Sequence, residues 1–297
     1  MFSVKLDRIL DRRYPDETLL DRLSNIAFLE ADIPEHEFIQ FRRLQSLIYR
    51  IRVAGYDIEA MQTEAFLGAI QLAFVNCKVA VTRSEYDCEI NDYIFNQISR
   101  RLPRNLIWLT TNANIEHPNV RALPIGLTDY CGYSFYHAII GDSAKFKSYI
   151  DAQPRTETNL VLMNFNERTN LSYRASVREL FKAKEFVTVD RYSPDEEGYR
   201  KYVRGLRSHP FCLSPRGNGI DTHRLWECMY AGCIPIVERT RALRDFSDLP
   251  IFFVADWKEA CDPAVMKKVR DQYYRRKWDL QKLTLSYWYR YICTLLG

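Results

Sequence analysis

The first thing to note in this 297-residue sequence is the set of familiar motifs that it lacks. Its eight cysteines form no CxxC pair, and its five histidines form no HxxH or HExxH motif. It contains neither a GxGxxG fingerprint nor a GK[ST] phosphate loop. We therefore expect no metal site and neither of the two best-known nucleotide-binding loops, and we interpret the cysteines as buried, reduced thiols of an intracellular protein.

A strong charge excess and a membrane-spanning run are missing as well. The chain has 42 basic and 38 acidic residues, a net charge of +4, without the basic stripe or block that binds nucleic acid. The N-terminus has no apolar signal-peptide core, and Gln71, Asn76 and Lys78 interrupt the longest apolar stretch, residues 65–81. The sequence predicts a soluble, cytoplasmic protein without a transmembrane segment, and its slight basic excess suits a small anionic ligand.

The length and the apolar content favour two domains. Hydrophobic residues make up 47% of the chain, and 297 residues exceed the usual size of one domain. We predict two α/β domains, residues 1–152 and 153–270, divided within a polar segment at 151–159. Residues 271–297 are expected to form a C-terminal helix that packs on the body and could reach back to the first domain.

Short apolar segments that run into polar loops indicate parallel strands with helices between them. In the first half, amphipathic helices up to residue 52 precede the expected strands 77–82, 105–111 and 120–125. In the second half, strands at 160–164, 186–189, 211–214 and 233–237 alternate with helices at 173–183, 195–206 and 221–231. Because ligands of such sheets lie beyond the carboxyl ends of the strands, we expect acceptor chemistry in the loops 84–92, 112–119 and 128–133.

Residues 211–237 (FCLSPRGNGIDTHRLWECMYAGCIPIV) carry the functional argument. They predict a strand, a glycine loop, a helix and a second strand. Gly217 and Gly219 would let backbone amides approach a ligand, and Asp221 or Thr222 would cap the helix.

The N-terminus of this helix is suited to an anion. Free amides and the helix dipole favour negative charge, and Arg216 and Arg224 add fixed positive charge. A diphosphate is the natural occupant. Glu227 would repel phosphate, but it can accept hydrogen bonds from two ribose hydroxyls. The order arginine, glycine loop, glutamate therefore predicts a site for the diphosphate and ribose of a nucleotide.

Residues 214–237 resemble the donor-binding signature of exostosin-like (family 47-type) glycosyltransferases, including the short soluble enzymes of large algal viruses, the chloroviruses. The resemblance extends to LVLMNFNERTNLSYR (160–174) and LPIGL (123–127). It implies an α/β, GT-B-like fold in which two Rossmann-type domains with parallel sheets face each other across a cleft. The first domain would serve the acceptor side and the second would bind the nucleotide-sugar.

The same resemblance implies a reaction. A sugar would pass, with inversion, from a UDP-sugar to a hydroxyl of an oligosaccharide or glycoprotein acceptor, in glycan synthesis such as that of a viral capsid glycan in the host cytoplasm. UDP-xylose is the leading candidate for the donor, and UDP-glucuronate, UDP-GlcNAc and UDP-galactose stay open.

The resemblance and the local pattern together assign the donor residues. Glu227 would bind the ribose. The residues expected on the diphosphate are Arg216, Gly217, Asn218, Gly219, Thr222, His223, Arg224 and Arg168. The residues expected on the base or the sugar are Asn164, Asn166, Tyr192 and Ser214.

An inverting transfer needs a base for the acceptor hydroxyl and charge stabilisation for the departing diphosphate. The sequence has no DxD triplet, and Asp57-Ile58-Glu59, the nearest in kind, is expected in a helix. Arginines and a helix dipole would take the place of a metal, so we expect no metal and no other cofactor. Asp87 is our first candidate for the base, and Asp92, Glu85 and Asp129 are the alternatives.

Other interpretations stay open. The chain could bind a nucleotide-sugar without catalysis, or it could be a retaining transferase on the same fold. A binder of phosphate backbones would use Arg12, Arg13, Arg42 and Arg43.

Overall fold

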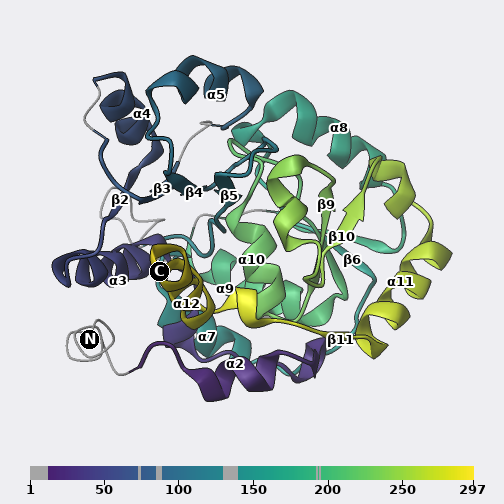
Figure 1. The fold of residues 1–297 in the computed structure, drawn as a ribbon. Coiled ribbons are helices and arrows are strands. Elements are labelled where there is room, and N and C mark those ends of the chain that lie inside the picture. Colours follow the sequence, from purple (N-terminus) through teal and green to yellow (C-terminus); the bar gives the residue numbers. More distant parts are fainter. Residues whose placement is uncertain (1–12, 73–74, 85–88, 130–139, 192, 194) are drawn as a thin grey trace.

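The protein is described by a computed structural model that covers residues 13–72, 75–84, 89–129, 140–191, 193 and 195–297. Two parallel β-sheets, one in each half of the chain, form its framework (Figure 1). A short antiparallel pair joins β1 (Ile26–Ala27) to β11 (Lys277–Trp278). Two parallel α/β units in one chain confirm the predicted GT-B-like fold.

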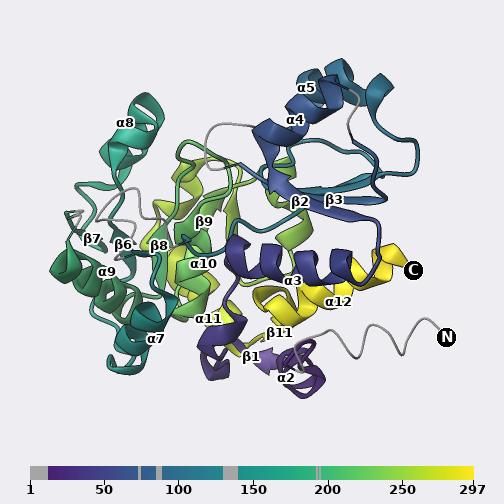
Figure 2. The ribbon, with the colours of Figure 1, turned by 90° about the vertical axis from the view of Figure 1, so that its left-hand side faces the viewer.

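The N-terminal sheet has four parallel strands in the order β2-β3-β4-β5. These are β2 (Ile58–Gln62), β3 (Val79–Arg83), β4 (Ile107–Thr110) and β5 (Val120–Ala122). Figure 2 shows α4 (Thr63–Gln71) and α5 (Asp92–Ile98) on one face of this sheet, and α3 (Phe41–Val53) and α12 (Leu285–Leu296) on the other. With both faces covered, every residue of β3 is buried, as expected for a strand inside a parallel sheet.

The C-terminal sheet has five parallel strands in the order β10-β9-β8-β6-β7. These are β6 (Val161–Met163), β7 (Val187–Val189), β8 (Phe211–Leu213), β9 (Ile234–Glu238) and β10 (Phe252–Val254). One face carries α8 (Leu171–Phe181), and the opposite face carries α9 (Glu196–Ser208) and α10 (His223–Tyr230) (Figure 2). The order of the strands reverses between β6 and β8, and in doubly wound sheets ligands bind at the carboxyl side of such a switch point.

The C-terminal tail contains two helices where one was expected. The first, α11 (Pro263–Arg275), is followed by β11, the 3-10 helix η7 (Gln281–Leu283) and then α12. The start of α12 is fixed to the N-terminal half, because Ser286 donates from its backbone N (2.9 Å) and its hydroxyl (2.6 Å) to the buried carboxylate of Glu37. Figure 1 accordingly places the C-terminus beside α3.

Two further elements differ from expectation. Ile58–Gln62 form β2, the edge strand of the N-terminal sheet, and Asp57 lies directly before it. The prediction that Asp57-Ile58-Glu59 lies in a helix is therefore wrong. The helix α7 (Ser143–Asp151) precedes the expected domain boundary, yet Phe146 stacks on Tyr199 of α9 with ring centroids 6.2 Å apart.

The remaining short elements connect these units. They are α2 (Glu17–Leu23) and the 3-10 helices η1 (Phe28–Glu30), η2 (Glu35–Glu37), η3 (Ser99–Arg101), η4 (Glu167–Thr169), η5 (Arg241–Phe246) and η6 (Trp257–Ala260). The six described cysteines are free thiols. Within the described residues, none of the helices combines the length and the apolar character that a membrane crossing requires.

Candidate functional site

A small pocket lies at the switch point of the C-terminal sheet. Its walls include Asn164, which follows β6, Tyr199 and Tyr202 from α9, and Arg224 and Glu227 from α10. These residues come from three separate segments of the chain, and the sheet topology brings them together. The location is the one at which this class of sheet binds ligands.

Asn164 presents an unused acceptor to this pocket. Its side chain is 2% exposed, and its Nδ2 donates to Asp190 Oδ2 at 3.0 Å. Within the described residues, its buried Oδ1 has no hydrogen-bond partner. Buried polar atoms are nearly always satisfied, so an exception that lines a pocket indicates a place for a ligand donor.

Glu227 is a buried carboxylate held by a neighbouring tyrosine. It is 7% exposed, and its Oε2 accepts a 2.9 Å hydrogen bond from the Tyr202 hydroxyl. Burial raises the pKa of Glu227, while the charge of Arg224 and the Tyr202 hydrogen bond oppose this shift. The Arg224 guanidinium lies 4.7 Å over the Tyr202 ring, so cation, ring and carboxylate form one cluster. The cluster holds a hydrogen-bond acceptor beside a positive charge.

Arg174, which the sequence analysis did not single out, organises the loops around this cluster. It donates to three backbone oxygens, from Nε to Arg216 at 3.0 Å, from Nη1 to Asn166 at 2.7 Å and from Nη2 to Pro215 at 2.9 Å. Burial, followed by the charge of Arg224, lowers the pKa of Arg174 to about 10. The side chain thus ties the loop after β6 to the loop after β8. Its only trace in the sequence is its place at the end of the run 160–174.

Contacts within the protein give the two loop glycines a further reason, while the approach of a ligand to their amides stays a prediction. A Cβ on Gly217 would lie 2.8 Å from Arg174 Nη2, and one on Gly219 would lie 2.7 Å from Asn112 Nδ2. The amide of Gly217 donates to the Gly219 carbonyl at 3.0 Å. Asn218, between them, is exposed.

The start of α10 also differs from expectation. Thr222 is the N-cap residue but makes no capping hydrogen bond with its side chain. Its hydroxyl instead lies 3.1 Å from that of the buried Ser214. His223, expected on the diphosphate, directs Nδ1 to the Gly126 carbonyl of the N-terminal half at 2.8 Å.

Asp221 joins the two halves of the molecule instead of capping the helix. Its Oδ2 accepts from the backbone N of Ile125 at 2.7 Å, and its Oδ1 accepts from Trp226 Nε1 at 2.8 Å. Burial raises its pKa to about 7, although these donors favour the ionised form. Its own backbone N donates to Asn112 Oδ1 at 2.9 Å, and Asn112 has a positive φ of 55°.

A carboxylate of the N-terminal half reaches the glycine loop. Glu89 Oε2 lies 3.5 Å from Arg216 Nη2, and Glu89 Oε1 accepts from Asn114 Nδ2 at 2.6 Å. Glu89 lies in the loop 84–92 that was predicted to face the acceptor, but it was not among the predicted site residues. Its position beside the arginine expected on the diphosphate makes Glu89 a candidate functional residue.

The other predicted donor residues are not gathered at the pocket. Asn166 uses Oδ1 to accept from the backbone N of Arg168 at 3.0 Å, and the Arg168 side chain is exposed. Tyr192 lies outside the described residues.

Four residues were predicted as candidates for the base. Two of them, Asp87 and Glu85, lie outside the described residues. Asp129 is buried in an ion pair with Arg83, and its second oxygen accepts from the backbone N of Arg42 at 3.2 Å. With both oxygens occupied, Asp129 is poorly suited to take a proton. Asp92 is exposed and pairs with Arg241 at 2.9 Å.

Comparison with known proteins adds a family-model match over part of the chain. A family model described as the Exostosin GT47 domain matches residues 142–261, which is less than half of the chain. The matched stretch contains β6 to β10, Arg174, the glycine loop and Glu227. The chain is a glycosyltransferase.

Two other comparisons add little to this. The solved structure of AviGT4, a glycosyltransferase involved in avilamycin A biosynthesis, is 10% identical to this glycosyltransferase, with a TM-score of 0.33 over 88% of this chain and 92% of that one. A similarity of this size carries no argument about function. No curated protein sequence matches the chain.

Within the described residues, no group of three or more His, Cys, Asp or Glu side chains could hold a metal ion.

Proposed function

We propose that this glycosyltransferase moves a sugar from a UDP-sugar to a hydroxyl of a glycan acceptor, with inversion and without a metal ion. The observation that carries the proposal is the cluster of Glu227, Tyr202 and Arg224 at the switch point. In the same pocket lies Asn164 Oδ1, which has no hydrogen-bond partner among the residues that the structure describes. A buried carboxylate can accept from ribose hydroxyls, and it repels phosphate. Ribose at Glu227 therefore directs the diphosphate away from it, toward the start of α10.

The diphosphate would lie where positive charge and the helix dipole combine. Arg216 and the N-terminus of α10 face the loops of the N-terminal half, where Glu89 now lies 3.5 Å from Arg216. A diphosphate carries more charge than one carboxylate, so it would displace Glu89 from this arginine. Fixed cations and helix dipoles that stabilise a departing diphosphate perform the task that a metal performs in other transferases.

Inversion requires one displacement at the anomeric carbon, assisted by a base on the acceptor side. The loop between β3 and α5 would supply it. Asp87 remains our first candidate, and Glu89 joins it because its carboxylate reaches the glycine loop. A general base contributes roughly 10²–10⁴-fold to the rate, so its removal should leave donor binding intact while turnover falls by that factor.

The experiment is a panel of UDP-sugars, with UDP-xylose first and UDP-glucuronate, UDP-GlcNAc and UDP-galactose beside it, assayed for UDP release in the presence of EDTA. Asp87→Asn and Glu89→Gln are tested in parallel, and NMR of the product gives its anomeric configuration. Turnover in EDTA with an inverted product supports the proposal. Binding without turnover would indicate a nucleotide-sugar-binding protein, a retained configuration would indicate the other mechanism on this fold, and a requirement for Mn²⁺ would contradict the metal-free site.

A further inference from the structure

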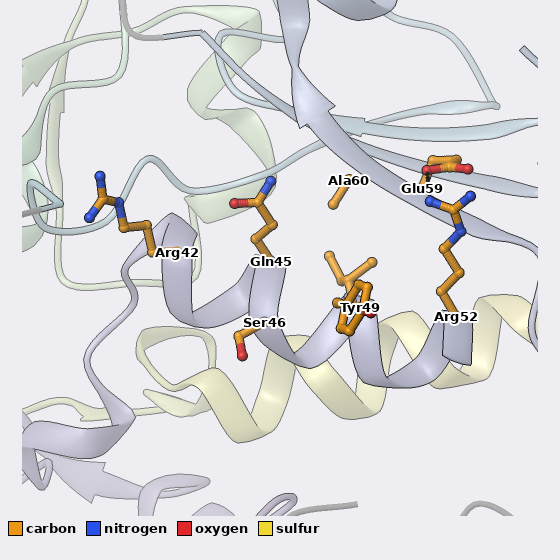
Figure 3. A pocket seen from close by; sticks show the side chains of 8 residues that line it. Arg42, Gln45, Ser46, Tyr49, Arg52, Glu59 and Ala60 are labelled. Carbon is orange, nitrogen blue, oxygen red and sulfur yellow. Dashed lines mark hydrogen bonds and ion pairs between the residues drawn. The ribbon is translucent and has the colours of Figure 1, made fainter. Parts of the chain in front are cut away.

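A second and larger cavity lies in the N-terminal half, between α3 and the edge strand β2 (Figure 3). Its volume is about 400 Å³, within the range of small-ligand sites. Figure 3 shows Gln45 extending from α3 toward β2, with Tyr49 on the same helix and Glu59 and Ala60 on the strand. We call this cavity the α3–β2 groove.

The lining of the groove has the chemistry of a carbohydrate site. Tyr49 is a large aromatic side chain that stays 66% exposed, so its ring face is open to a ligand. Aromatic faces carry partial negative charge, and the C–H bonds of a sugar ring pack against them. Around the ring stand Gln45 and the ion pair of Arg52 with Glu59 at 2.8 Å, all able to bond hydroxyls.

The groove leads toward the reaction centre. Because α3 runs back along β2, Arg42 at its start lies near the carboxyl end of the N-terminal sheet, and Arg52 lies near the other end. The backbone N of Arg42 donates to Asp129 at 3.2 Å, and Asp129 pairs with Arg83, the last residue of β3. A chain of sugars seated on Tyr49 could therefore extend past Arg42 to the loops that meet the glycine loop.

The charge of the lining gives the groove a preference for acidic sugars. Glu59 neutralises Arg52 within the lining, which leaves Arg42 as its net positive charge. A guanidinium binds a carboxylate through two parallel hydrogen bonds, so a sugar acid suits this end of the groove.

From these observations we infer that the α3–β2 groove binds a remote part of the acceptor glycan, with one sugar ring on Tyr49 and an acidic sugar at Arg42. The inference rests on the proposed function, because it extends the acceptor side of the same reaction. It predicts that affinity rises with the length of the acceptor and with its acidic character, while the reaction at the donor is unchanged.

The test begins with an array of defined neutral and uronate-containing oligosaccharides of two to eight residues. For each oligosaccharide that the wild type binds, calorimetry then compares the affinity of the wild type with that of Tyr49→Ala and of Arg42→Gln. The matched control is Tyr93→Ala, because Tyr93 is 70% exposed and lies on α5, on the opposite face of the N-terminal sheet. Release of UDP from the donor is followed in each variant, so that failure of the proposed function itself is recognised separately.

The expected result is binding of the longer uronate-containing chains, weakened about tenfold in Tyr49→Ala and unchanged in Tyr93→Ala. Arg42→Gln should reduce the preference for acidic over neutral chains to less than about twofold, and UDP release without acceptor should match the wild type in all three variants. A wild type that turns over its donor but binds no oligosaccharide on the array would overturn the inference. Equal binding by the wild type and Tyr49→Ala would overturn it as well.

Discussion

Replacing Arg174 with lysine should loosen the donor loops while it keeps the positive charge. The guanidinium donates from three nitrogens to the carbonyls of Asn166, Pro215 and Arg216, whereas a lysine has one nitrogen and can reach one of them well. Each hydrogen bond from a charged group contributes about 1.5–3 kcal/mol, so the loss of two amounts to about 3–6 kcal/mol. Water can reach part of the freed loop, and we expect a net loss of about 2–4 kcal/mol in the free energy of unfolding.

Urea unfolding of the wild type and Arg174→Lys measures this loss, and calorimetry with UDP measures its effect on the site. UDP affinity should fall at least about tenfold, because the loops after β6 and β8 lose their common tie. The control is Lys182→Ala at the C-cap of the same helix, which removes an exposed pair with Glu179 and should cost less than about 1 kcal/mol. If Arg174→Lys unfolds within about 0.5 kcal/mol of the wild type and binds UDP equally well, the organising role of Arg174 is wrong.

Three further changes test separate contacts. Burial raises the pKa of Asp221 from its ordinary value of 3.8 to about 7. The stability contributed by its protonated form is therefore fully present below about pH 4 and is lost as the pH rises through 7. Urea unfolding at pH 5 and pH 8 should show a smaller decrease in stability for Asp221→Asn than for the wild type, and equal decreases would contradict the assignment. Gly219→Ala should lower the melting temperature, at a cost of about 1–3 kcal/mol, because the new Cβ would lie 2.7 Å from the buried Asn112 amide; an unchanged melting temperature would show that this contact relaxes freely. Tyr202→Phe removes the 2.9 Å hydrogen bond to Glu227 and should weaken UDP binding about tenfold in calorimetry with little change in fold by circular dichroism, whereas unchanged affinity would separate Tyr202 from the site.

The elements predicted most accurately from the sequence are those whose signals are local. The strand β8, the helix α10 and the strand β9 follow one another within 28 residues, 211–238, and each has its own apolar pattern and its own terminating residue. Gly232, for example, ends α10 with a φ of 73°, a conformation that glycine adopts freely. The parallel α/β fold followed from such segments.

The strand β2 could not be predicted in the same way. Its sequence, IEAMQ, carries no strict alternation, and its burial comes from pairing with β3 and from packing of α3 over it. Both partners are supplied by the tertiary structure. The segment therefore reads as a continuation of the helices that flank it.

The assignment of Glu227 to the ribose stays a prediction, and the structure adds neighbours of Glu227 that the sequence did not indicate. Glu227 and Arg224 belong to one helix, so their proximity is visible in the sequence. Arg174 bonds Pro215, and Asn112 bonds Asp221, across loops that are far apart in the chain, and only the fold shows these contacts. The same is true of the glycines, whose near neighbours are side chains from other segments.

The central claim is that UDP binds at the carboxyl ends of β6 and β8, with its ribose on Glu227. The most direct measurement is calorimetry of UDP in EDTA with the wild type, Glu227→Gln and Glu37→Gln. Glu37, in the N-terminal half, is also a buried glutamate, and it accepts a hydrogen bond from the Ser286 hydroxyl. Its replacement therefore controls for the general effect of changing a buried carboxylate. We predict that Glu227→Gln weakens UDP binding by about 10–100-fold, the effect of losing a charged hydrogen bond, while Glu37→Gln binds as the wild type does. Equal affinity of Glu227→Gln and the wild type would contradict the assignment of the donor site.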